Sequence, residues 1–246
     1  MNHIRILDLP VDPVNMNSAL QFVDEHIRNG AAPAYIVCAN PEKVYQLRRV
    51  LRLRAFFEAA QLVVPDGIGI VIAARFLHGR RLTRVPGADL MQAICAAAPA
   101  RNYRIFIYGA SEATNREAVR TLRLRYPGID IVGSQDGYLP AKEMDGLISR
   151  INQARPDILF VALGSPRQEM WIQQYLPRLD VKVVQGIGGT LDTIAGSVRR
   201  APRWMQGAGL EWFYRLLQQP SRAYRQLCLL RFAAEILLVK LTGEPV

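Results

Sequence analysis

Short runs of apolar, often β-branched residues alternate along this chain with longer segments in which apolar residues recur every three or four positions. Strands that are apolar throughout are typical of a parallel sheet with both faces buried, and the longer segments have the periodicity of amphipathic helices. The pattern therefore predicts an α/β fold in which a mostly parallel sheet carries helices on both faces. We expect six strands, at residues 34–40, 62–66, 104–110, 129–133, 157–164 and 181–189.

The pattern changes after Gly196. Before this point, helical segments carry clear end signals, such as Ser111 as an N-cap and Gly30 as a C-cap. After it no strand pattern remains, and the sequence predicts two or three helices interrupted by Pro202, Gly207, Gly209 and Pro220. We therefore expect two parts: a core, residues 1–195, and a C-terminal helical appendage, residues 196–246.

Nearly every expected strand ends in small or polar residues, at 38–41, 65–67, 108–111, 164–166 and 186–190. Ligands bind outside the carboxyl ends of parallel strands, where helix N-termini offer backbone N–H groups to phosphate. One such turn is ordinary in a βα connection, but five on one rim favour a nucleotide cleft. Asp66 stands in one of these turns, where its carboxylate can cap the following helix or face a bound ligand.

The net charge of +10 indicates an anionic partner: nucleic acid, anionic lipid or a phosphorylated substrate. Half of this excess lies between residues 199 and 246, where eight basic side chains outnumber three acidic ones. Apolar runs there are too short to span a membrane, so two alternatives stay open: helices that lie in a membrane interface, or helices that dock on the core. Three widely spaced cysteines and an N-terminus without a secretory signal are typical of a protein that stays in the reducing cytosol.

Several nucleotide and catalytic motifs are absent. The GIGGTLD segment begins like a dinucleotide fingerprint, but Leu191 stands where the third glycine belongs, and Ile72 breaks the GIGIVI segment in the same way. Hydride transfer with NAD(P) is therefore the weaker enzymatic alternative. A phosphate loop, a G-x-S-x-G elbow and a D-x-D metal pair are missing as well, so we expect arginine to neutralise any bound phosphate.

Five segments taken in order, PDGIGIV, RVPGADL, ALGSPRQEMWI, GIGGTLDTIAGSVRRAP and LEWFYRLLQQPSRAYR, closely resemble the WecG/TagA/CpsF family, glycosyltransferase family 26. The resemblance implies a Rossmann-like core whose helical appendage closes the active site against the cytoplasmic membrane face. It also implies an inverting transfer from a UDP-sugar to a polyprenyl-diphosphate-linked sugar for cell-surface polysaccharide, with no cofactor and no essential metal. N-acetylmannosamine, its uronic acid and glucose all occur as transferred sugars in the family.

The resemblance also implies site residues. Asp66 matches the proposed general base, which must take the proton of the acceptor hydroxyl as it attacks the anomeric carbon. Asn40 matches a polar residue beside that base, and Cys38 stands where some relatives have threonine. The other substrate-binding positions are Arg84 and Gln168 for sugar or diphosphate oxygens, Tyr138 and Asp192 for the nucleoside, and the glycines Gly188 and Gly189.

Three arginines of the appendage, Arg215, Arg222 and Arg225, match positions that reach the diphosphates. Guanidinium groups suit this task because the leaving UDP gains negative charge, although a solvated basic face is the alternative. The partners implied are a UDP-sugar, a lipid-linked acceptor and an anionic membrane surface on the cytoplasmic side, rather than nucleic acid. A basic module that binds nucleic acid or membrane is the non-enzymatic alternative, and the oligomeric state, including a homo-oligomer, is left open.

Overall fold

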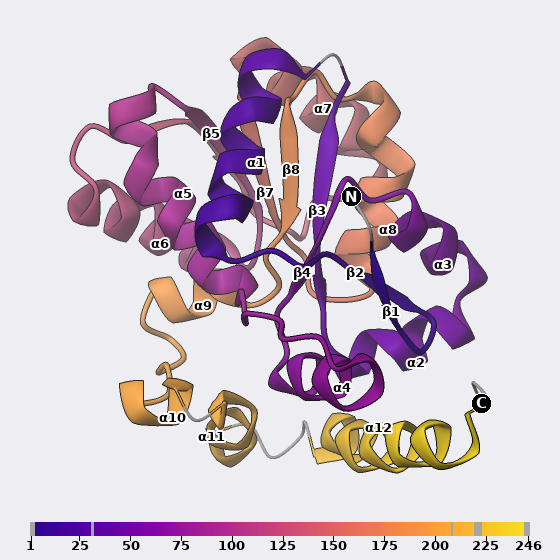
Figure 1. The fold of residues 1–246 in the computed structure, drawn as a ribbon. Helices are drawn as coiled ribbons and strands as arrows, with labels where there is room; N and C mark the ends of the chain where they lie inside the picture. Colours follow the sequence, from indigo (N-terminus) through magenta and orange to yellow (C-terminus); the bar gives the residue numbers. More distant parts are fainter. Residues whose placement is uncertain (1–2, 31, 208, 219–222, 244–246) are drawn as a thin grey trace.

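The computed structural model describes residues 3–30, 32–207, 209–218 and 223–243, without the side chains of residues 51, 203, 215 and 223–227. Six parallel strands form one sheet in the order β4-β3-β8-β7-β5-β6 (Figure 1). They are β3 (Ala34–Ala39), β4 (Leu62–Pro65), β5 (Arg104–Gly109), β6 (Asp130–Gln135), β7 (Ile158–Ala162) and β8 (Val183–Gly186). All six strands expected from the sequence are confirmed, with ends that differ by up to three residues.

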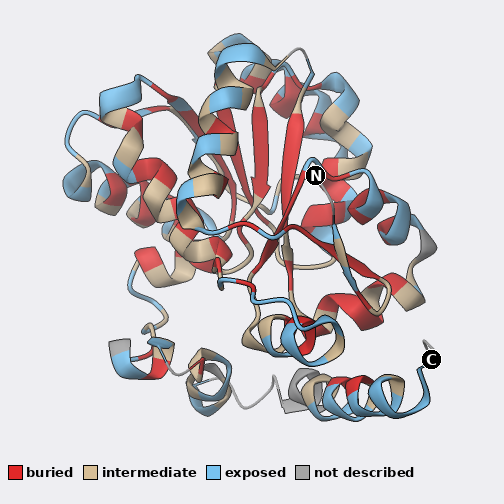
Figure 2. Ribbon diagram, in the orientation of Figure 1, coloured by how far each residue is buried: buried red, intermediate tan, exposed pale blue. Residues whose placement is uncertain are grey.

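Helices cover both faces of this sheet, and the strands between them are buried (Figure 2). One face carries α2 (Pro41–Arg49), α3 (Leu51–Glu58), α4 (Ile68–His78), α7 (Met144–Ala154) and α8 (Arg167–Tyr175); the other carries α1 (Met16–Asn29), α5 (Gly87–Arg101), α6 (Glu112–Arg125) and α9 (Thr190–Ile194). Successive residues of β3 alternate between the two layers: Tyr35 and Val37 belong to the first core cluster and Ile36 to the second. This is why the strands are apolar throughout.

The ends of several helices follow from local sequence. Ser111 caps α6, as expected, by accepting a hydrogen bond from the backbone N–H of Thr114 at 3.2 Å, and Gly30 closes α1. The sequence pattern missed a short antiparallel hairpin, β1 (Ile4–Ile6) and β2 (Leu9–Val11), because three-residue strands are too short to show a period. Two single turns of 3₁₀ helix, η1 (Ala141–Glu143) and η2 (Leu176–Arg178), complete the core.

Strands β3 and β8 are neighbours at the centre of the sheet, yet the helices that follow them lie on opposite faces. The chain leaves β3 into α2 on one face and leaves β8 into α9 on the other. Where two neighbouring connections diverge in this way, a crevice forms outside the carboxyl ends of the strands. The fold therefore places a binding cleft beside the turns that follow β3 and β8.

Three helices follow Gly196 within the described residues: α10 (Arg203–Gly207), α11 (Glu211–Gln218) and α12 (Ala223–Thr242). They lie beyond the carboxyl ends of the strands, at the bottom of Figure 1. Helix α12 packs against α2 and α4 and buries Phe232 and Ile236 in the first core cluster. The helical pattern expected after Gly196 is thus confirmed. No helix in the described part of the chain is long and apolar enough to cross a lipid bilayer.

Candidate active site

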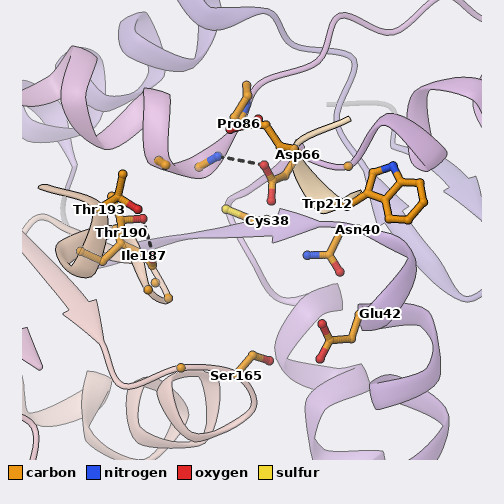
Figure 3. Close-up of a pocket in the computed structure, with 18 of the residues that line it drawn as sticks. Cys38, Asn40, Glu42, Asp66, Pro86, Ser165, Ile187, Thr190, Thr193 and Trp212 are labelled. Carbon is orange, nitrogen blue, oxygen red and sulfur yellow. Dashed lines mark hydrogen bonds between the residues drawn. The ribbon is translucent and has the colours of Figure 1, made fainter. Parts of the chain in front are cut away.

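A cleft of about 820 Å³ opens at the carboxyl ends of the central strands. Turns after four adjacent strands, β4, β3, β8 and β7, line it together with α11 of the appendage (Figure 3). The turn at residues 108–111, after β5, is not among the described residues that line the cleft. Four of the five small-residue turns expected on one rim therefore meet in a single cleft.

Asp66 follows β4 and faces this cleft (Figure 3). Its Oδ1 accepts a hydrogen bond at 3.1 Å from the backbone N–H of Gly87, the first residue of α5. It does not cap the helix that follows it, α4, because the N-cap residue there is Gly67 and makes no side-chain cap bond. The backbone N–H groups of Asp66 and Gly67 both donate to the carbonyl of Ala39 at 3.0 Å, which ties the turn to β3. The carboxylate is thus held through one oxygen at the start of α5.

Burial raises the pKa of Asp66, while the positive charge of Arg84 and the hydrogen bond from Gly87 act in the opposite direction. The negative charges of Glu211 and Asp89 add to the upward shift. A carboxylate with a raised pKa is a better proton acceptor near neutral pH. Burial therefore makes the Asp66 carboxylate more basic than an exposed aspartate.

Cys38, near the end of β3, and Asn40, which follows this strand, lie next to Asp66 (Figure 3). Burial, and then the nearby Asp66 charge, raises the pKa of the Cys38 thiol well above its usual value, so the thiol stays protonated. A Cβ at Gly87 would lie 2.4 Å from the Cys38 Sγ, so this close approach requires glycine. Asn40 caps α2 by accepting a hydrogen bond from the backbone N–H of Lys43 at 3.2 Å, and its amide faces the cleft.

A buried ion pair joins the turns on the opposite wall. Lys43 of α2 pairs with Glu169 of α8, where both side chains are almost fully buried, and it also donates to Ser165. Gln168 donates to Glu169 at 3.1 Å and accepts from the backbone N–H of Gly188 at 2.9 Å. A buried charge that loses its partner is costly, so this network fixes the turns after β3, β7 and β8 relative to one another.

Arg84 lies between the core and the appendage. Its Nε donates to the backbone carbonyl of Asp66 at 2.8 Å, which places the guanidinium beside the candidate base. Its Nη1 donates to the carbonyl of Gln206 in α10 at 3.1 Å, and its Nη2 pairs with Glu211 Oε2 in α11 at 2.5 Å. Two of the three acceptors of Arg84 therefore belong to the appendage.

Glu211 contacts a second arginine as well. Its Oε1 accepts from Arg200 Nε at 3.2 Å, and Arg200 Nη2 pairs with Asp89 of α5 at 2.5 Å. Although partial burial acts against ionisation, the hydrogen bond from Arg84 and the charge of Arg200 lower the pKa of Glu211, so it is ionised at neutral pH. Four side chains of alternating charge, Arg84, Glu211, Arg200 and Asp89, thus connect the Asp66 turn through α11 to α5.

The structure brings six of the expected site residues to one cleft: Asn40, Asp66, Arg84, Gln168, Gly188 and Gly189. Tyr138 and Asp192 are not among its described lining residues, and the Tyr138 side chain is 76% exposed. Arg222 lies outside the described residues. Arg215 and Arg225 belong to α11 and α12, where the description covers their backbone alone.

Sequence reasoning missed four charged residues of this region: Lys43, Glu169, Arg200 and Glu211. For Glu169, Arg200 and Glu211 the available signal was position, because each lies within a segment that carries the family resemblance. Lys43 lies outside all five segments. Lys43 and Glu169 are 126 positions apart, and Arg84 and Glu211 are 127 positions apart. A single sequence does not indicate which of its distant residues form such pairs.

Comparisons with known proteins identify the family of this chain. A family model described as Glycosyl transferase WecG/TagA/CpsF family matches residues 4–245. A relative from Bacillus subtilis (strain 168) is 33% identical over 235 residues, which cover 94% of this chain and 90% of the relative. A relative from Bacillus spizizenii (strain W23) is 35% identical over 204 residues, which cover 83% of this chain and 79% of the relative. Both are named N-acetylglucosaminyldiphosphoundecaprenol N-acetyl-beta-D-mannosaminyltransferase. These matches favour glycosyl transfer over hydride transfer, and the chain belongs to the WecG/TagA/CpsF family of glycosyl transferases.

Proposed function

We propose that this chain transfers N-acetylmannosamine from its UDP-sugar to N-acetylglucosamine that is linked through a diphosphate to undecaprenol. The name shared by two relatives that align over most of the chain supports this choice of sugar and acceptor. In the reaction, the bond between the anomeric carbon and UDP breaks, and a bond from that carbon to the acceptor oxygen forms. The hydroxyl proton passes to a base, and UDP leaves. The product is an extended lipid-linked glycan for cell-surface polysaccharide.

The observation that carries the proposal is the position of Asp66 in the cleft. The Gly87 N–H holds one carboxylate oxygen, so the other is available to an acceptor hydroxyl. Burial raises the pKa of this group, which favours proton uptake during the attack. We assign Asp66 as the general base, with Asn40 beside it to orient the reacting sugar.

The turns after β7 and β8 suit the UDP part of the donor. The Gly188 N–H already donates to Gln168, whereas no described residue accepts from the N–H of Gly189. Backbone N–H groups in such a turn can bind phosphate oxygens. Arg215, Arg222 and Arg225 are the cations that we propose for the diphosphates, since Arg84 is engaged with protein groups in the described structure.

The outer face of α12 supports binding to a membrane surface. Leu230, Ala234, Leu237 and Leu241 follow one stripe of this helix, and the three leucines are 72%, 51% and 74% exposed. The buried residues Phe232 and Ile236 lie on the other side of the helix. Since both sides of α12 are apolar, docking on the core leaves a second apolar stripe without a partner among the described residues.

Phe76 of α4 and basic residues near it extend this face. Phe76 is 43% exposed, and the Lys240 Nζ of α12 lies 5.8 Å from the centre of its ring. The turn after α4 adds the exposed Arg80 and Arg81. Exposed leucines flanked by cations are suited to the interface of an anionic bilayer. We therefore propose that residues 196–246 form a membrane-associating appendage that completes the active site of a core, residues 1–195, on the cytoplasmic face.

The proposal is tested by offering the purified chain three donors, UDP-N-acetylmannosamine, its uronic acid and UDP-glucose, with a synthetic N-acetylglucosaminyl-diphosphoryl-lipid acceptor. Released UDP measures turnover, and mass spectrometry identifies the product. We expect the N-acetylmannosamine adduct. Preference for one of the other donors would refute the sugar assignment, and the absence of UDP release with every donor would refute the proposed reaction.

A further inference from the structure

One carboxylate of the appendage contacts the core at the edge of the cleft. Glu211 is the first residue of α11, and its two oxygens contact Arg84 and Arg200. All three side chains are between 22% and 25% exposed, so water screens these contacts only in part. Among the described acidic residues of α10, α11 and α12, Glu211 alone lines the cleft.

The contact restricts Arg84 in particular. The guanidinium of Arg84 is held in three directions, by the carbonyl of Asp66, the carbonyl of Gln206 and the carboxylate of Glu211. The last contact is the charged one and so the strongest of the three. Without it, Arg84 keeps two neutral acceptors and gains freedom beside the candidate base.

The same contact sets one wall of the cleft. Trp212 and Tyr214 follow Glu211 in α11, and both line the cleft. At the other end of α11, Gln218 exchanges hydrogen bonds with the backbone of Arg199 at 2.8 and 3.2 Å. Helix α11 is therefore held at both ends, and among its described side chains Glu211 is the one linked through Arg84 to the Asp66 turn.

We infer that Glu211 is a positioning residue for glycosyl transfer: through Arg84 and Arg200 it docks α11 on the core and thereby fixes Arg84 beside Asp66. It does not touch the reacting atoms. The inference rests on the proposed function only where turnover is measured, because the docking itself exists without substrate.

The test replaces Glu211 by Gln, which keeps the shape of the side chain and removes its charge. Hydrogen exchange of residues 203–218, measured on the full chain without substrate, should become faster. Turnover should fall by about tenfold to a hundredfold, the usual effect of misplacing a group near the chemistry, while the donor KM stays nearly constant. The acid limb of kcat/KM should move to lower pH, because a negative charge near Asp66 is lost. Glu211→Asp should restore part of each effect.

Glu235→Gln is a matched control. Glu235 also lies in the appendage and also bridges two arginines, Arg48 at 2.8 Å and Arg231 at 3.2 Å, but it does not line the cleft. We expect this variant to speed exchange in α12 and to leave turnover with a water-soluble acceptor and the acid limb unchanged. The inference is overturned if Glu211→Gln keeps wild-type exchange in residues 203–218, or if both variants lower turnover equally with no change in the pH profile. If the wild type does not use UDP-N-acetylmannosamine, the proposed function fails, but the exchange measurement still decides the role of Glu211.

Discussion

Asp66→Asn isolates the proton transfer from the rest of the site. The amide oxygen of asparagine can still accept the hydrogen bond from Gly87, which is 3.1 Å away, so the turn after β4 should keep its shape. The amide cannot accept the proton of the acceptor hydroxyl. Loss of a general base costs roughly two to four orders of magnitude in rate. This corresponds to about 3 to 5 kcal/mol of transition-state stabilisation.

The assay is UDP release under saturating donor and acceptor, together with a titration of UDP binding by calorimetry. We expect kcat to fall by the stated factor and the affinity for UDP to stay close to that of the wild type. Asp145→Asn is the control, because Asp145 is an exposed carboxylate on α7 that pairs with Arg178 and does not line the cleft. If a folded Asp66→Asn protein kept turnover within a factor of about three of the wild type, Asp66 would not be the general base, because a general base contributes a far larger factor to the rate.

Three further predictions concern stability, membrane binding and metal. Because the pKa of Asp66 is raised in the folded chain, its ionised form destabilises the fold as the pH rises through that pKa. Asp66→Asn should therefore melt at a higher temperature than the wild type at neutral pH and lose this advantage in acid. A lower melting temperature of the variant at neutral pH would contradict the pKa shift. Leu237→Glu and Leu241→Glu should weaken sedimentation with anionic vesicles and leave turnover of a short, water-soluble acceptor unchanged. Leu124→Glu, at a similarly exposed leucine of α6, should change neither property, and equal losses of vesicle binding in all three variants would argue against the α12 face. Activity should survive EDTA, since arginine replaces a metal in the proposed chemistry, and a loss that Mg²⁺ or Mn²⁺ restores would reveal a metal site.

The sheet was predictable because each of its strands is a short apolar run that can be recognised from local sequence. Ile36 and Val37 point to opposite faces and are both buried, so an apolar run without alternation identifies a parallel strand between two helical layers. The turn chemistry was equally local, as the cap of α6 at Ser111 shows. The hairpin β1–β2 was missed because its strands hold three residues each.

The cleft was predictable in outline and not in its contacts. Asp66 could be placed at the end of a strand from the chain alone, but its hydrogen bond joins it to Gly87, which the sequence does not pair with it. Helix capping, one of the two roles that the sequence leaves open for Asp66, is not found in the structure, because the carboxylate binds the start of α5 instead. Arg84 shows the same limit, because its charged partner, Glu211, lies 127 positions further along the chain.

The anomeric configuration of the product tests the central claim most directly. A single displacement, in which Asp66 activates the acceptor hydroxyl on the side opposite UDP, must invert the configuration at the anomeric carbon. The product formed from UDP-α-N-acetylmannosamine and the N-acetylglucosaminyl-diphosphoryl lipid should be isolated, and the one-bond C–H coupling at its anomeric carbon measured by NMR. The account predicts a β-linked N-acetylmannosamine. An α-linked product would show retention and would contradict the assignment of Asp66 as the base of a single inverting step.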